Sequence, residues 1–225
     1  MRAEVERRLE TLFAARALPL GAIGRGLVFQ LVDALGCLPV AEIGRQNAAL
    51  DRPERASLSR LGVRFGTESI YFDPLLRADT MRFRALLWAV RNARPVPPLP
   101  SARRLAKPLE IDPVLPPSFY SAIGLRVLAG FALRPDRLER LAAAARRLAR
   151  HGPFSAGAEL AAIAGVEPAV LRRLLSALGY RAVIAAGQET FVARPRRQRE
   201  INKSRRRLPP GDGHPFAKLK ELKLA

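Results

Sequence analysis

Apolar side chains recur at helical spacing through most of the first 94 residues. In three stretches they lie three or four residues apart, as in amphipathic helices. These stretches are residues 2–15, 22–36 and 74–93. Two shorter helices are expected within 40–62, because Asp51 can cap the second of them and Pro53 suits its first turn. The pattern therefore predicts an N-terminal helical domain.

The periodicity changes between residues 63 and 72. Apolar and polar side chains alternate over 63–65, and the following Gly-Thr-Glu can turn the chain into the apolar run 69–72. Alternation beside a glycine-containing turn is typical of a β-hairpin. We therefore expect one small hairpin near 63–72, inside the helical domain at 1–94.

Proline dominates residues 95–117, where eight prolines occur. Proline fixes φ and has no backbone N–H, so this density excludes a continuous helix and favours an extended, semi-rigid chain. We expect a connector between two domains. Its apolar residues, such as Leu105 and Leu109, suggest that it lies against a core.

The second half of the chain predicts helices and strands in a particular order. The expected elements are a helix near 118–123, strands at 126–128 and 131–133, helices over 135–150, 155–164 and 168–178, and a strand pair over 180–193. Ser155 is expected to cap the helix that begins there, and Gly165 is expected to end it.

Helix, short helix, glycine turn, helix and hairpin is the order of a winged helix-turn-helix. In that layout the third helix is presented outward and the hairpin is the wing. The sequence therefore predicts a mainly α fold with small β elements (α+β). It has a helical domain at 1–94, a connector at 95–117, a winged-helix-like domain at 118–194 and a basic tail at 195–225. A plain three-helix bundle with an unrelated hairpin is the simpler alternative.

The charge balance narrows the range of partners that the protein is expected to bind. The 225 residues include 39 Lys and Arg but only 20 Asp and Glu, a formal net charge of +19. This excess favours a polyanionic partner. Genome bias explains a preference for Arg over Lys, but it does not explain the shortage of acids.

Other features of the composition exclude several classes. A single cysteine rules out a disulfide framework, and two separated histidines disfavour a zinc site. No apolar run reaches the roughly 18 residues of a membrane span, and the N-terminus does not resemble a signal peptide. We therefore predict a cytoplasmic protein without a membrane partner.

No catalytic constellation is visible in the sequence. It lacks a GxxxxGK[ST] phosphate loop, a GxSxG nucleophile motif and an HExxH zinc motif. We expect no catalytic residue, no metal and no cofactor in this chain, and no activity from the chain alone.

Arginines are clustered on the predicted helices and in the tail. The planar arginine fork suits phosphate oxygens, and each phosphate contact releases counterions. Aromatic residues make up only 6% of the chain, which argues against a base-stacking platform and favours backbone contacts. Any single arginine is more often a solvated side chain lying over apolar surface. The candidate nucleic-acid-binding residues are Arg140, Arg147, Arg172, Arg173, Ser176, Arg196, Arg197, Arg199, Arg205, Arg206 and Arg207.

The spacing within the helix predicted over 135–150 sorts its arginines onto faces. Arg140 and Arg147 are seven residues apart and share one face. Arg146 and Arg150 are four apart and share another.

Several short motifs carry a family resemblance. They are SLSRLGVRFG at 57–66, PLLR at 74–77, RALLWA at 84–89, LPPSFY at 115–120 and PFAKLKEL at 215–222. Together they resemble the C-terminal region of alphaproteobacterial superfamily-2 helicases, which are similar to the RNA helicase of the mitochondrial degradosome. The resemblance implies that a two-lobed motor holds ATP and Mg through a phosphate-binding loop, a DExH box and an arginine finger. None of these motifs occurs in this sequence.

What the resemblance implies about function is specific. In that family this region packs on the motor and helps to hold the nucleic-acid strand. The leading hypothesis is therefore a non-catalytic accessory region of an ATP-dependent RNA or DNA helicase. Its partners would be the helicase motor domains and single-stranded RNA or DNA.

Two alternatives remain open. A winged-helix DNA-binding transcriptional regulator would use Arg172 or Arg173 to reach guanine edges. A protein-interaction module would use the basic tail only for solubility.

Overall fold

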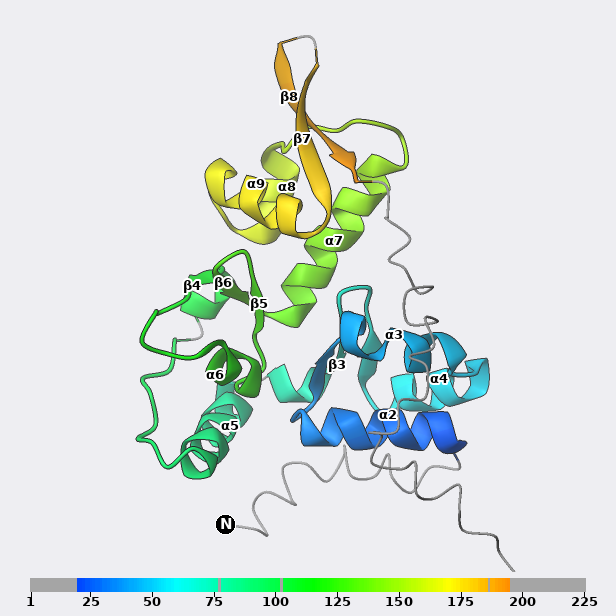
Figure 1. The fold of residues 1–225 in the computed structure, drawn as a ribbon, viewed down its shortest axis with the longest axis vertical. Helices are drawn as coiled ribbons and strands as arrows, with labels where there is room; N and C mark the ends of the chain where they lie inside the picture. Colours follow the sequence, from blue (N-terminus) through cyan, green and yellow to red (C-terminus); the bar gives the residue numbers. More distant parts are fainter. Residues whose placement is uncertain (1–19, 77, 102, 186, 195–225) are drawn as a thin grey trace, which may run out of the picture. The chain divides into compact units, whose positions relative to one another are not determined.

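The computed structural model of the chain is a mixed α+β structure of helices and small antiparallel sheets (Figure 1). It describes residues 20–76, 78–101, 103–185 and 187–194. The α+β class expected from the sequence is confirmed. The helix predicted over 2–15 lies outside the described residues, as does the tail at 195–225.

Residues 20–72 form a first group of helices and strands, here called module A. Its elements are α2 (Ala22–Asp33), β1 (Cys37–Pro39), α3 (Val40–Ala49), α4 (Arg52–Arg60), β2 (Val63–Phe65) and β3 (Ser69–Phe72). Strand β3 pairs antiparallel with both β1 and β2, so the strand order is β1-β3-β2. The predicted hairpin is present, whereas β1 was not predicted.

The core of module A draws on every helix and on the central strand. Leu27 and Leu31 of α2, Leu58 of α4, and Ile70 and Phe72 of β3 are buried together. All four residues of β3 are buried, because the strand has a neighbour on each edge and helices over it.

The start of α4 follows the expected capping pattern. The Asp51 carboxylate accepts a hydrogen bond from the backbone N–H of Glu54 at 2.7 Å. Pro53 occupies the first turn, where its missing N–H costs nothing. This local chemistry sets the boundary between α3 and α4.

The middle of the chain forms a second core. Its elements are η2 (Asp73–Leu76), α5 (Ala78–Arg91), η3 (Arg104–Ala106), β4 (Leu109–Glu110), α6 (Pro117–Ala122), β5 (Arg126–Leu128) and β6 (Phe131–Leu133), with strand order β4-β6-β5. The Trp88 and Phe119 rings meet edge to face, with centroids 5.0 Å apart. Leu105 and Leu109 are buried in the same core, so the proline-rich segment packs against it as the sequence indicated.

Residues 135–193 form a last group, here called module B. Its elements are α7 (Pro135–Ala149), α8 (Ala158–Ala164), α9 (Pro168–Ala177), β7 (Tyr180–Ala185) and β8 (Gln188–Ala193). Strands β7 and β8 form a two-stranded sheet. Leu141, Leu171, Leu174 and Phe191 have no exposed surface and fill the core between helices and hairpin.

The expected cap at Ser155 is wrong. Helix α8 begins at Ala158 with Gly157 at its N-cap. Phe154 instead pairs with Phe191 of β8, through backbone hydrogen bonds of 3.1 and 2.6 Å. This pairing keeps the chain extended just before Ser155, so the helix starts later. Gly165 does end α8, in the left-handed conformation with φ of 68°.

Modules A and B share one order of elements. Each runs helix, short extended segment, helix, helix and hairpin. In each, the last strand of the hairpin pairs with the short extended segment, as β3 with β1 and Phe191 with Phe154. Helix α4 in module A therefore corresponds to α9 in module B.

Glu139 of α7 joins the two modules, which belong to the same compact unit. Its Oε1 accepts the backbone N–H groups of Glu68 at 2.9 Å and Ser69 at 2.7 Å. Its Oε2 accepts the N–H of Thr67 at 2.7 Å and the Thr67 hydroxyl at 3.1 Å. A Cβ at Gly66 would overlap this carboxylate, so the turn of the module A hairpin approaches α7 closely.

Candidate nucleic-acid interface

A surface groove of about 540 Å³ runs along α7 and α8. Helix α7 turns Leu138, Leu141 and Ala145 into the core, which leaves its arginines on the outer surface. The groove is lined by Arg140, Ala143, Ala144, Arg146, Arg147, Arg150, Glu159 and Ile163. Four arginines and one carboxylate therefore line one groove.

The spacing of the α7 arginines explains how they converge. Arg140 and Arg147 share a helix face, as the sequence predicted, and Arg146 and Arg150 lie beside them. Between Arg140 and Arg146 the groove is lined by the small side chains of Ala143 and Ala144, which leave it open. The groove can therefore accept a chain of phosphate groups.

Carboxylates pair with two of the groove arginines. Arg147 lies 2.9 Å from a carboxylate oxygen of Glu159 on α8, and both side chains are largely exposed. Arg140 lies 3.4 Å from Asp136. Exposed ion pairs contribute only about 0–1 kcal/mol, so a phosphate can replace a carboxylate at little cost. Within the described part of the chain, Arg150 forms no ion pair.

Asp136 at the start of α7 is held in its charged form. Burial alone would raise its pKa, but the hydrogen bond and charge of Arg134, together with Arg140, outweigh that effect and lower the pKa. The Arg134 contact is two-pronged, with distances of 3.0 and 3.1 Å to the two carboxylate oxygens. Arg140 is thus only a secondary partner of Asp136.

The candidate residues on α9 do not join the groove. Arg172 forms an ion pair of 3.1 Å with Glu189 of β8. Arg173 donates a hydrogen bond of 2.9 Å to the carbonyl of Ala129, and its guanidinium lies over the Phe131 ring, 4.7 Å from the centroid. Ser176 is half-buried. These arginines tie α9 to the hairpin and to the β5–β6 turn.

The remaining candidates belong to the tail. They lie outside the described residues and are Arg196, Arg197, Arg199, Arg205, Arg206 and Arg207.

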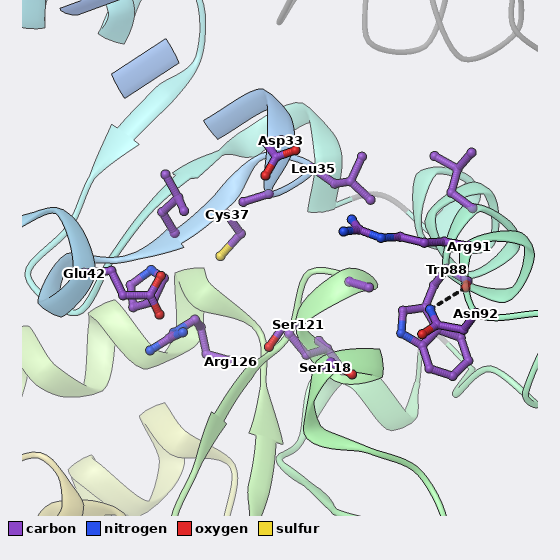
Figure 2. A pocket seen from close by; sticks show the side chains of 16 residues that line it. Asp33, Leu35, Cys37, Glu42, Trp88, Arg91, Asn92, Ser118, Ser121 and Arg126 are labelled. Carbon is purple, nitrogen blue, oxygen red and sulfur yellow. Dashed lines mark hydrogen bonds between the residues drawn. The ribbon is translucent and has the colours of Figure 1, made fainter. Parts of the chain in front are cut away.

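A second cavity, of about 590 Å³, lies between module A and the middle region (Figure 2). Leu35 and Leu38 of module A face it, as do Trp88 of α5 and Leu125. Cys37 also lines it. Burial raises the pKa of the Cys37 thiol, and nearby Arg84 and Arg126 offset this only in part. A protonated thiol is a poor nucleophile, which argues against nucleophilic chemistry at this cavity.

Two further properties of the described residues concern metal binding and membranes. No group of three or more metal-ligating side chains is found among them. In the same part of the chain, no helix is both long and apolar enough to cross a membrane.

Comparison of the chain with family models, curated proteins and solved structures gives no match. The proposed function therefore depends on the residues and geometry of this chain and on the resemblance carried by its short motifs.

Sequence reasoning found the arginines of the groove but missed its opposite wall. Glu159 and Ile163 come from α8, and nothing in their own spacing marks them as part of a site. They reach the groove because α8 packs against α7. The sequence also gave no sign that Arg173 would contact Phe131.

Proposed function

We propose that this chain is a non-catalytic nucleic-acid-binding accessory region of an ATP-dependent helicase. The observation that carries the proposal is the groove along α7 and α8, where four arginines and one carboxylate converge. Arginine is suited to phosphate oxygens, and a groove lined this way can follow a nucleic-acid backbone.

Module B is proposed to be a winged-helix domain. The order α7, α8, α9, β7 and β8 supports this, as does the left-handed Gly165 between α8 and α9. The bridge from Phe154 to Phe191 supplies the strand pairing that such a domain needs before its second helix. In this proposal, β7 and β8 form the wing.

The contacts are proposed to involve the phosphate backbone rather than base edges. Of the α9 arginines, Arg173 is held by the Ala129 carbonyl and lies over the Phe131 ring, whereas Arg172 has an exposed ion pair with Glu189 like that of Arg147 in the groove. The engagement of Arg173 disfavours a sequence-reading transcriptional regulator that would use this residue. Of the groove arginines, Arg146 donates a hydrogen bond to the Thr67 hydroxyl. Arg140 and Arg147 have ion pairs in which the arginine is largely exposed, and such pairs contribute only about 0–1 kcal/mol.

The motor is proposed as the second partner. This part of the proposal rests on the family resemblance, in which ATP and Mg bind the motor. The cavity lined by Leu35, Leu38 and Trp88 supports a docking role, and polar side chains such as Glu42 and Arg91 line it as well. A cytoplasmic location belongs to the same proposal.

Fluorescence anisotropy with labelled single-stranded RNA, single-stranded DNA and duplex DNA tests the proposal. The double variant Arg147→Ala/Arg150→Ala should weaken binding about tenfold, or about 1.4 kcal/mol. It should also reduce the slope of log K against log salt by about 1.4 for a single strand. The matched control, Arg82→Ala/Arg94→Ala, removes the same charge from exposed positions outside the groove.

Two results would contradict this proposal. The first is binding that does not depend on salt, or no binding at all. The second is an equal loss of affinity in the groove variant and the control, because this would indicate an effect of net charge alone. ATPase measurements on the purified chain should give no turnover.

A further inference from the structure

Helix α4 of module A stands in the position that α9 has in module B. Both are the third helix of the same element order, and each precedes a hairpin whose last strand pairs back to the first extended segment. The proposed winged-helix layout presents that third helix outward. In module A the helix in that position is α4, so its surface residues are the ones that this layout presents outward.

The outer face of α4 is basic, and the side chain between its two arginines is small. Of its nine residues only Leu58 is buried. Arg52, Ala56 and Arg60 are exposed, and their spacing of four residues places them along one face. The rise of an α-helix puts the two arginine backbones about 12 Å apart. The alanine between them leaves room for a backbone to lie across the helix.

The two acids at the start of α4 accept backbone hydrogen bonds. The carboxylate of Asp51 accepts the N–H of Glu54, and that of Glu54 accepts the N–H of Gly21 at 2.6 Å. Within the described residues neither Arg52 nor Arg60 forms an ion pair. Among the described residues, Arg60 donates a hydrogen bond to the Ser57 hydroxyl, at 3.2 Å, and to no other group. By contrast, Arg140, Arg147 and Arg172 all have carboxylate partners.

A third arginine of α4 has an internal role. Arg55 donates hydrogen bonds to Asn47, and its guanidinium lies over the Phe65 ring, 4.5 Å from the centroid. It fixes α4 against α3 and β2. The outer arginines therefore project from a helix whose own position is secured.

The hairpin that follows α4 is bound to α7. Its turn is held by Glu139 of α7, through the N–H groups of Thr67, Glu68 and Ser69. A free wing would add contacts beside the helix, and module A does not offer one. Contact through α4 is thus limited to the helix face, which suits phosphate groups better than base edges.

We infer that the α4 face with Arg52 and Arg60 is a second contact surface for a nucleic-acid phosphate backbone, separate from the α7–α8 groove. This inference rests on the proposed function, because it concerns the same ligand. It implies that the chain holds nucleic acid at two places rather than one.

The test compares three double variants of the full chain in the anisotropy assay, with single-stranded RNA, single-stranded DNA and duplex DNA as separate probes. Arg52→Ala/Arg60→Ala should weaken binding about fivefold or more, with a reduced salt slope. Arg52→Lys/Arg60→Lys should recover most of the affinity, because it keeps both charges. Arg82→Ala/Arg94→Ala is the charge-matched control and should stay within about twofold of the unaltered chain.

A second measurement does not depend on the variants being folded. Photo-crosslinking of 4-thiouridine RNA to the unaltered chain should label the peptide that contains residues 52–60. The inference is overturned if that peptide is unlabelled and Arg52→Ala/Arg60→Ala behaves like the control. If Arg147→Ala/Arg150→Ala still loses affinity in that case, the proposed function stands. An unaltered chain that binds no probe overturns both.

Discussion

Modules A and B use their hairpins in opposite ways. In module A, β3 is completely buried and the hairpin turn is fixed to α7 through Glu139. In module B the hairpin is largely exposed, and Ile184 on β7 is 82% exposed. The same order of elements thus serves internal packing in one module and leaves a free projection in the other (Figure 1).

The two modules also stabilise their hairpins differently. Module A has a three-stranded sheet, in which β1 and β2 both pair with β3. Module B has only a single bridge between Phe154 and Phe191 before its second helix. Aromatic packing compensates, because Phe154 meets Tyr180 edge to face with centroids 5.2 Å apart. An element order alone therefore does not determine which interactions hold a hairpin.

The largest expected effect is the loss of the Phe191 ring, whose centroid lies 6.1 Å from that of Phe154 in module B. Phe191→Ala should lower the free energy of unfolding by about 3–5 kcal/mol, because it removes a fully buried ring. Urea denaturation measures this, with Ile184→Ala on the same hairpin as the exposed control, expected within about 0.5 kcal/mol of the unaltered chain. A cost below about 1 kcal/mol for Phe191→Ala would refute the dependence on aromatic packing.

The next effect concerns the contact that holds the module A hairpin. Glu139→Ala should cost about 2–3 kcal/mol, since three backbone N–H groups lose a charged acceptor. Hydrogen exchange of the amides of Thr67, Glu68 and Ser69 should accelerate. Glu159→Ala removes an exposed carboxylate and should cost at most about 1 kcal/mol. Equal costs for the two variants would contradict a specific role for Glu139.

A smaller effect tests whether Arg173 of α9 stabilises the fold or binds nucleic acid. Arg173→Met should cost about 1 kcal/mol, because it removes a hydrogen bond to Ala129 and the contact with the Phe131 ring. Its affinity for single-stranded RNA should stay within about twofold of the unaltered chain, measured by anisotropy. A large loss of duplex DNA affinity with unchanged stability would instead favour base reading by α9.

Glu159→Gln is expected to raise affinity. It removes the charge that pairs with Arg147, so a phosphate no longer competes with a carboxylate. A gain of about twofold to threefold corresponds to the small energy of an exposed ion pair. Glu167→Gln, at the start of α9, makes the same charge change away from the groove and should give a smaller gain. Equal gains would show that only net charge matters.

The smallest effect is a pH dependence at the start of α7. Because Arg134 and Arg140 lower the pKa of Asp136, the folded state binds a proton there less readily than the unfolded state. The resulting stabilisation is complete above the ordinary pKa of 3.8 and is lost as pH falls through the lower folded value. Thermal melts should show that Asp136→Asn lowers Tm at pH 7 and that this difference shrinks in acid. A difference that grows in acid would contradict this assignment.

Local signals predicted much of the fold. The capping of α4 by Asp51, the hairpin of β2 and β3, and the turn at Gly165 all follow from short-range backbone preferences. Strand β1 could not be predicted in this way, because a segment of three residues has no periodicity of its own. It forms only against β3. The misplaced cap at Ser155 has the same cause, since the pairing of Phe154 comes from a strand far along the chain.

The candidate interface was predictable in part. Helical periodicity placed Arg140 and Arg147 on a common face, and both line the groove. Periodicity could not reveal Glu159 opposite them. Nor could it show that Arg172 and Arg173, on the exposed side of α9, would be engaged by Glu189 and Ala129.

The sequence by itself determined the helices, the turns and the excess of positive charge, because these depend on neighbouring residues or on composition. Tertiary structure decided which arginines face an open groove and which are tied to the fold. It also decided which hairpin is free. The reason is that these outcomes depend on pairs distant in sequence, such as Glu139 with Thr67, 72 residues apart. Arg173 and Ala129, 44 residues apart, are another such pair.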